Sequence, residues 1–276
     1  MTGAAEVLAP RAVREPESER GFYAVSTLVF AASATATIVW CGTMSAMGGM
    51  TMPGGWTMSM AWMRMPEQTW AGAAATFLGM WDLMMVAMMM PALIPMLSRY
   101  RQAAGAARID RLGLGSRTAL VAAGYFFVWT VFGIAAFPAG VALAASAMRF
   151  PALARAVPIM AGVVVFAAGL FQITSWKAHH LVCCREAPGR GRTLPADAGT
   201  AWRHGLRLGL HCARCCAGLI AILLALGVMD LRAMAIVAAA ITVERLAPRG
   251  ENVARAVGAV VVGAGLFLIA RAAGLA

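Results

Sequence analysis

Long apolar stretches separated by short polar segments dominate this chain. Runs with no or almost no charge fall at about residues 22–42, 70–97, 118–146, 156–176, 208–229, 232–247 and 255–271. An α-helix needs about 20 mainly apolar residues to cross the hydrocarbon core of a bilayer. The pattern therefore predicts an all-α fold, a polytopic membrane helix bundle of about seven transmembrane helices.

The polar segments between these runs predict the domain organisation. Residues 1–21 are polar and carry both Glu and Arg, which is typical of a disordered tail and unlike a cleavable signal peptide. Residues 22–272 form a single transmembrane helical domain. Two of its loops are distinctive, because residues 43–69 are rich in Met, Gly and Trp, and residues 177–207 are rich in His, Cys and Arg.

Charge placement predicts the topology. With the N-terminus inside, 17 positive charges fall on cytoplasmic segments and five outside, which agrees with the positive-inside tendency. Loop 43–69 is then outside and loop 177–207 inside. Run 232–247 is short, but if it did not cross, Arg245, Arg249 and Arg255 would move outside, so we predict seven spans with the C-terminus outside.

Composition agrees with a membrane protein. The 276 residues are 61% hydrophobic and 13% charged, with a mean hydropathy of +0.74, which lies outside the usual range of soluble domains. The net charge of +11 comes from arginines clustered between apolar runs without interleaved aromatic residues, so it favours a topology signal over nucleic-acid binding. We expect a multi-pass protein of a bacterial-type inner (plasma) membrane, in contact with lipid.

Methionine is concentrated in one part of the chain. Fifteen of the twenty methionines lie between residues 44 and 96, and their polarisable thioethers suit the soft ion Cu(I). In the outer loop, a Gly-rich segment could fold several thioethers around one ion; the candidate ligands are Met44, Met47, Met50 and Met52. The alternative interpretation is that these residues are interfacial hydrophobes beside an aromatic belt of Trp56, Trp62 and Trp70.

The second apolar run carries a methionine ladder. Met80, Met84 and Met88 recur every four residues and so share one helical face, with Trp81, Met85 and Met89 as the adjacent stripe. Adaptable core packing is the competing interpretation, because Met fills irregular gaps.

An acidic residue interrupts the same run. Asp82 lies inside it, where a carboxylate is costly and is a functional candidate by default. We include Asp82 among the candidate metal ligands. The alternative is a structural pair with another intramembrane polar group, either Arg214 or a residue of the third or fourth apolar run such as Gln172.

Two clusters near the inner face repeat a pattern of two possible ligands followed by a Cys pair. The first comprises His179, His180, Cys183 and Cys184, and the second comprises His211, Cys212, Cys215 and Cys216. Thiolates with imidazoles suit Cu(I) or Zn²⁺. Disulfides are disfavoured on the reducing side of a membrane, and inert buried cysteines remain the alternative. Cys41 is expected to pack.

Three segments together resemble a known family. They are Met80-Trp81-Asp82 through Met88-Met89-Met90-Pro91, Ala168 to Thr174 with Lys177 and Cys184-Arg185, and Cys215-Cys216 through Gly227 to Asp230 and Glu244-Arg245. They are similar, over roughly residues 75–272, to an uncharacterised prokaryotic family of predicted metal-binding integral membrane proteins. The resemblance implies a multispan fold and a metal site. This chain departs from the family pattern at His180, where Cys is expected, and at Arg214, where a small residue is expected.

These patterns favour a metal-binding membrane protein that handles Cu(I) by binding, transfer or transport. No enzyme motif is recognisable, so we expect no catalytic activity. Expected partners are the metal ion, lipid, and a membrane cuproenzyme or soluble copper carrier. A non-catalytic subunit or assembly partner of a larger membrane complex is the second hypothesis. A redox enzyme using haem or quinone is a weaker third, because few histidines lie in the apolar runs.

Overall fold

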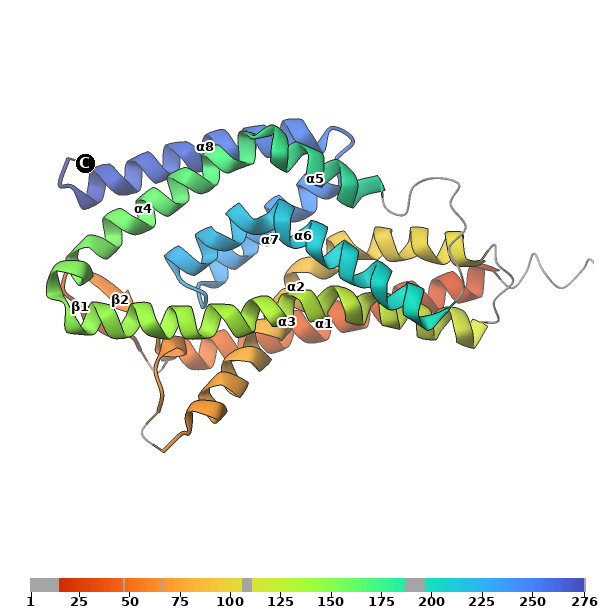
Figure 1. The fold of residues 1–276 in the computed structure, drawn as a ribbon, viewed down its shortest axis with the longest axis horizontal. Coiled ribbons are helices and arrows are strands. Elements are labelled where there is room, and N and C mark those ends of the chain that lie inside the picture. Colours follow the sequence, from red (N-terminus) through yellow and green to blue (C-terminus); the bar gives the residue numbers. More distant parts are fainter. Residues whose placement is uncertain (1–14, 47, 66, 106–110, 187–196, 276) are drawn as a thin grey trace, which may run out of the picture.

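The computed structural model describes residues 15–46, 48–65, 67–105, 111–186 and 197–275, and this part of the chain is almost entirely helical (Figure 1). The all-α prediction is confirmed. The helices are α1 (Glu15–Ala46), α2 (Trp70–Gly105), α3 (Arg111–Arg149), α4 (Pro151–Ile173), α5 (Ser175–Glu186), α6 (Ala198–Leu226), α7 (Leu231–Leu246) and α8 (Gly250–Ala272). Between α1 and α2 lie an antiparallel hairpin, β1 (Met50–Met52) and β2 (Trp56–Met58), and a 3₁₀ turn, η1 (Met60–Trp62).

Six of the described helices are long and apolar enough to cross a membrane, namely α1, α2, α3, α4, α6 and α8. Helix α7 corresponds to the short predicted run 232–247 and has only 16 residues, fewer than the roughly 20 that a full crossing needs. Large apolar side chains face outward on several helices, with Leu28, Ile236 and Val260 about 70% exposed. Such a surface is consistent with contact with lipid.

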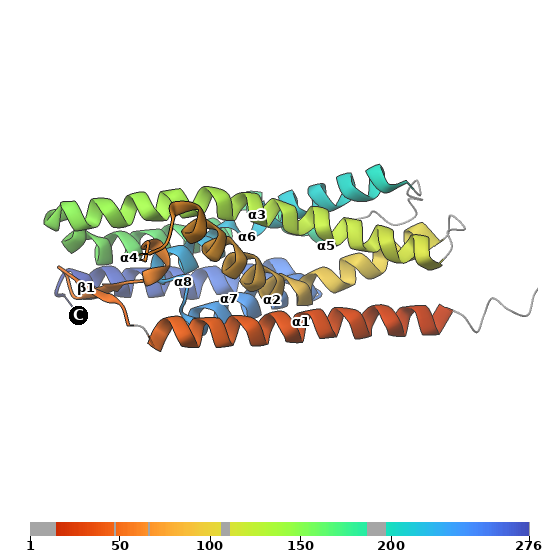
Figure 2. The same cartoon turned by 90° about the horizontal axis from the view of Figure 1, so that it is seen from below.

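The helices form an elongated bundle whose two ends differ. Figures 1 and 2 show the hairpin and the end of α8 at one end, and the start of α1 with the adjoining ends of α2 and α3 at the other. Helix α2 contains Pro91 and Pro95 and changes direction along its path in Figure 1, because an internal proline removes a backbone hydrogen bond.

Several segments expected to be irregular are helical. Helix α1 begins at Glu15, so residues 15–21 of the expected tail are helical, whereas residues 1–14 lie outside the described residues. Within the expected loop 177–207, the described residues belong to α5, to α6 and to the N-cap residue of α6, Asp197. The physical reason is that Glu, Lys and Arg are good helix formers, so polar sequence ends an apolar run without ending the helix.

Helix α6 begins ten residues before its apolar run. Its N-cap is Asp197, whose carboxylate accepts a hydrogen bond from the Thr200 backbone N–H at 2.8 Å. This bond lowers the pKa of the Asp197 carboxyl. His211 and the cysteines that follow it therefore lie in the middle of a helix, not at its start as the apolar pattern indicated.

Small residues bring the helices close together around these cysteines. On α6, a Cβ added at Gly209 would stand 2.8 Å from the carbonyl oxygen of Tyr125 on α3. On α4, a Cβ at Gly169 would stand 2.6 Å from the backbone nitrogen of Val262 on α8. Backbone contact of this kind is typical of packing between membrane helices, and it fixes how α6 faces α3.

Candidate functional site

Four cysteine thiols from two helices meet in the interior, and we call Cys184, Cys212, Cys215 and Cys216 the thiol cluster. Each is at most 2% exposed. Cys184 of α5 lies 3.9 Å from Cys215 of α6, measured between sulfurs. On α6 itself, the Cys215 and Cys216 sulfurs are 3.6 Å apart, and those of Cys212 and Cys216 are 4.0 Å apart. Positions three and four residues apart share a helical face, which is why the α6 cysteines converge.

A thioether and a phenol extend the cluster at Cys212. The Cys212 sulfur lies 3.9 Å from Met89 Sδ of α2 and 2.8 Å from the Tyr125 hydroxyl of α3. Met89 and Tyr125 are both completely buried. Four helices, α2, α3, α5 and α6, therefore contribute to one sulfur-rich centre.

A guanidinium group lies against the same sulfurs. Arg245 of α7 is 5% exposed, and its Nη2 lies 3.2 Å from the Cys215 sulfur, 3.6 Å from that of Cys216 and 3.9 Å from that of Cys184. Its Nε and Nη1 atoms are buried without a hydrogen-bond partner. A buried arginine whose near neighbours are thiols is an expensive arrangement, which points to a functional reason for it.

A polar network holds α7 beside the cluster. Lys177 of α5 pairs with Glu244 of α7 at 2.6 Å, and both are almost fully buried. Gln172 of α4 donates to Glu244 at 2.7 Å and accepts from Lys177. The polar side chains satisfy one another, and because Glu244 precedes Arg245, the network fixes the register of α7 against the thiols.

The turn after α7 is held from the same side. Arg185, the residue after Cys184, donates to the carbonyl oxygens of Ala247 at 2.5 Å and Pro248 at 3.1 Å. These carbonyls end α7 and begin the turn into α8, and charge-assisted hydrogen bonds are among the stronger kinds. Helix α5 therefore contacts α7 through Lys177 and the turn after α7 through Arg185, and Cys184 lies between these two residues in the sequence.

The predicted histidine ligands lie beside the thiol cluster. The rings of His180 on α5 and His211 on α6 are 5.8 Å apart, and the Nδ1 atom of each is buried without a partner. Burial lowers the pKa of His180, and nearby His211 and Arg214 act in the same direction, which favours the neutral imidazole. His179 Nε2 contacts Cys183 at 3.7 Å on the exposed side of α5. Cys183 is therefore separated from the thiol cluster.

Both predicted methionine stripes of α2 are buried. Met80, Met84 and Met88 are at most 4% exposed and pack in one apolar core with Met85 and Met89. The thioether that contacts a thiol belongs to Met89, in the stripe adjacent to the predicted ligand face.

Asp82 pairs with a polar residue of α3, which is one of the structural alternatives considered from the sequence, and not with Arg214 or Gln172. It is half-buried, and its Oδ1 accepts a hydrogen bond from the Thr130 hydroxyl of α3 at 3.0 Å. Gln172 belongs to the Lys177–Glu244 network instead. Arg214 lies on the exposed side of α6.

The outer methionines belong to the end of α1 and to the hairpin, not to the helices that contribute to the thiol cluster. Met44 is half-buried near the end of α1, and Met47 lies outside the described residues. Met50 is exposed, whereas Met52 is buried with Met58 against small residues of α3 and α4. The hairpin register pairs Met50 with Met58, so these methionines share one face of the hairpin. The predicted flexible loop is therefore a hairpin at this point, and Met52 packs in its apolar face.

A second sulfur contact lies towards the hairpin end. Cys41 is 1% exposed, and its sulfur lies 3.9 Å from Met229 Sδ in the turn between α6 and α7. The neighbouring Trp40 ring lies 4.0 Å from a Cβ placed at Gly79 on α2, beside the first methionine of the ladder. Cys41 packs, as expected, but against another sulfur.

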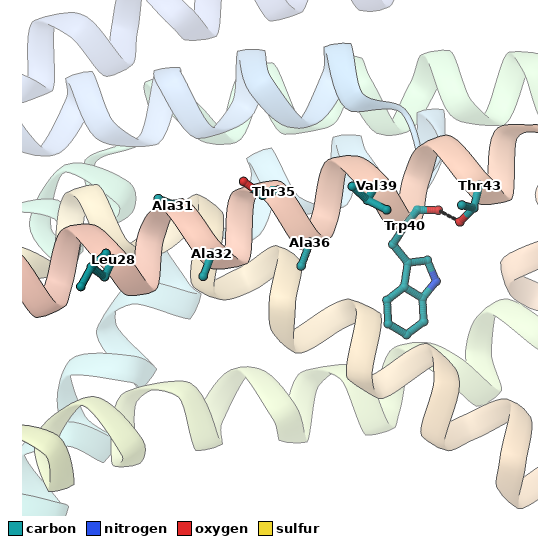
Figure 3. A pocket seen from close by; sticks show the side chains of 8 residues that line it. All are labelled: Leu28, Ala31, Ala32, Thr35, Ala36, Val39, Trp40 and Thr43. Carbon is teal, nitrogen blue, oxygen red and sulfur yellow. Dashed lines mark hydrogen bonds between the residues drawn. The ribbon is translucent and has the colours of Figure 1, made fainter.

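Two cavities of the described residues lie away from the thiol cluster. A groove along α1, seen in Figure 3, is lined by residues such as Leu28, Ala32 and Trp40 and carries no cysteine or histidine. A cavity of about 790 Å³ lies beneath the hairpin. Among the described residues, no three or more His, Cys, Asp or Glu side chains are already arranged as ligands around one point. The thiols would have to rotate to share an ion.

Three residues of the site were not identified from the sequence as part of it. Met89 was named as part of the adjacent stripe, and Arg245 was named in the Glu244-Arg245 segment of the family resemblance, but neither was proposed as part of the site. Tyr125 had no signal in the sequence, because a tyrosine in an apolar helix is unremarkable until the fold places Cys212 beside it.

Comparison with known protein families gives a match over most of the chain. Residues 78–268 match the sequence model of a family described as PpoB2: Copper chaperone. The matched region includes the whole thiol cluster, Arg245 and the methionine ladder from Met80 onward. No curated protein and no solved structure matches the chain.

Proposed function

The chain belongs to the PpoB2 copper chaperone family, and from this premise we propose that it is a membrane-embedded protein that holds Cu(I) at the thiol cluster and passes it on without catalysing a reaction. Cysteine from two helices and the thioether of Met89 would supply the ligands. The convergence of four thiols and one thioether in the interior carries this proposal.

The donor set supports copper in the Cu(I) state. Thiolate and thioether are soft ligands that suit Cu(I), whereas carboxylate and carbonyl oxygens suit Mg²⁺ and Ca²⁺. The contacts within the thiol cluster are between sulfurs, and the nearby carboxylate of Glu244 is occupied by Lys177. Zn²⁺ remains an option where the imidazoles of His180 and His211 join the thiols.

The distances support a shared ion. A metal–sulfur bond to an ion such as Zn²⁺ is about 2.3 Å, so two sulfurs on one ion lie within about 4.6 Å of each other. The contacts within the thiol cluster are 3.6–4.0 Å. Side-chain rotation, without movement of the helices, would then bring the sulfurs to one point.

The buried methionines of α2 support transfer along the bundle. Successive members of the ladder rise about 6 Å per four residues, and Met89 brings this line to Cys212. At the other end, Cys41 and Met229 form a sulfur contact beside the start of the ladder. We propose that copper collected at the outer, hairpin end of a bacterial inner membrane reaches the thiol cluster by this line of sulfurs, for delivery to a cuproenzyme or soluble carrier.

Two adjacent cysteines give a matched test. Cys184→Ala removes a thiol of the cluster, whereas Cys183→Ala removes one that lies outside it. Cu(I) binding to purified full-length protein would be measured anaerobically by competition with a chromophoric chelator. We expect about one tightly bound Cu(I) in the wild type and in Cys183→Ala, and at least a tenfold weaker affinity in Cys184→Ala.

The contradicting outcomes are specific. Equal loss of affinity in both variants would place the site at the exposed face of α5. A wild-type protein that binds no Cu(I) would overturn the proposal and favour the assembly-partner hypothesis.

A further inference from the structure

Arg245 is the charged group of the site that the proposed ligand set does not use. Its guanidinium is buried, and Nη2 approaches three of the four thiols while Nε and Nη1 have no partner. A positive charge at this position would offset negative charge that develops on the thiols.

Among the described residues, no carboxylate forms an ion pair with Arg245. The adjacent Glu244 points to Lys177 at 2.6 Å and accepts from Gln172 at 2.7 Å. The Glu244–Lys177 pair is therefore neutral by itself, and the hydrogen-bond contacts of the Arg245 guanidinium among the described residues are with sulfurs. With four protonated thiols, the centre would carry one uncompensated positive charge in the interior, which is unfavourable.

Copper binding changes this balance. When two cysteine thiols each release a proton to water and bind one Cu(I) ion, the two thiolates and the ion together carry a charge of −1, and a thioether ligand such as Met89 adds none. With Arg245 the total is zero. The approach of Nη2 to Cys215 at 3.2 Å also places a charge-assisted donor where the thiolate charge would develop.

We infer that Arg245 is a positioning residue whose positive charge balances the anionic copper–thiolate centre and thereby sets how tightly the thiol cluster holds Cu(I). This inference rests on the proposed function. It adds that the affinity for Cu(I) depends on Arg245, which is not a ligand. It also adds that the buried charge of Arg245 lowers the stability of the metal-free protein.

The test replaces the charge and keeps a hydrogen-bond donor. Arg245→Gln should weaken Cu(I) binding by at least tenfold, or about 1.4 kcal/mol, measured on the full-length protein by anaerobic chelator competition. The metal-free variant should unfold at the same temperature as the wild type or higher, because a buried charge has been removed. Arg245→Lys keeps the charge and should recover most of the affinity.

Arg214→Gln is the matched control, because Arg214 lies on the exposed side of α6 between Cys212 and Cys215; its affinity should match that of the wild type. Unchanged affinity in Arg245→Gln would overturn the inference. So would a loss of affinity accompanied by an equal loss of metal-free stability, since that indicates a purely structural arginine. A wild type without Cu(I) would instead overturn the proposed function, which the wild-type measurement reports separately.

Discussion

At the scale of single residues, the Lys177–Glu244 pair shows how this interior tolerates charge. Both side chains are almost inaccessible and 2.6 Å apart, and Gln172 completes their hydrogen bonding. A buried ion pair is weak support for stability as a whole, but removing one partner leaves the other charge uncompensated. The network therefore matters most for keeping α7 in one position beside the thiols.

Lys177→Leu should destabilise the protein by about 3 kcal/mol, because it leaves the Glu244 carboxylate buried and unpaired. The double variant Lys177→Leu/Glu244→Gln should recover most of that loss. Unfolding of the detergent-solubilised protein by heat or denaturant measures both, with the exposed Arg203→Leu as a control expected to stay within about 0.5 kcal/mol. A single variant as stable as the wild type would show that water reaches this pair.

At the scale of helices, the apolar runs predicted seven of the eight described helices, and the errors have a common cause. Helix α5 and the first ten residues of α6 are too polar to register as apolar runs, yet they are helical and carry Cys184 and the α6 N-cap. Hydropathy reports where apolar sequence ends, whereas a helix ends where its caps and propensities allow.

The candidate site was predicted in part. Spacing identified the cysteines, because positions on one helical face can be read from sequence. It could not show that Cys183 faces away from Cys184, nor that α2 is rotated so that Met89 meets Cys212. Those facts depend on how separate helices rotate against one another, and the glycine contacts account only for how α6 faces α3.

The methionine ladder of α2 gives a prediction at this scale. Changing Met80, Met84 and Met88 together to Leu should preserve folding, since Leu has similar volume and helix propensity. Copper bound per folded protein under reducing conditions should nevertheless fall, because Leu has no sulfur lone pair. Asp82→Asn should also lower occupancy, with little loss of folded protein, by removing a negative charge. Unchanged copper content in the triple variant would assign the ladder to packing alone.

At the scale of the whole molecule, the two ends of the bundle carry different chemistry. The hairpin end holds methionine and tryptophan, while the thiol cluster lies between α5, α6 and the end of α7. Thioethers stay as ligands in an oxidising compartment, where paired thiols tend to become disulfides. In the predicted orientation, which stays a prediction, the hairpin would face outside and the cysteines would lie nearer the reducing side.

The topology can be tested with reporters that are active only outside the cytoplasm. Fusions at residue 60 and at the C-terminus should be active, and a fusion in the segment between α5 and α6 should be silent. The C-terminal fusion is the informative one, because it depends on whether the 16-residue helix α7 crosses. Figures 1 and 2 show the end of α8 at the same end of the bundle as the hairpin, so we expect both of those fusions to be active. A silent C-terminal fusion beside an active one at residue 60 would remove α7 as a span and move Arg249 and Arg255 to the outside.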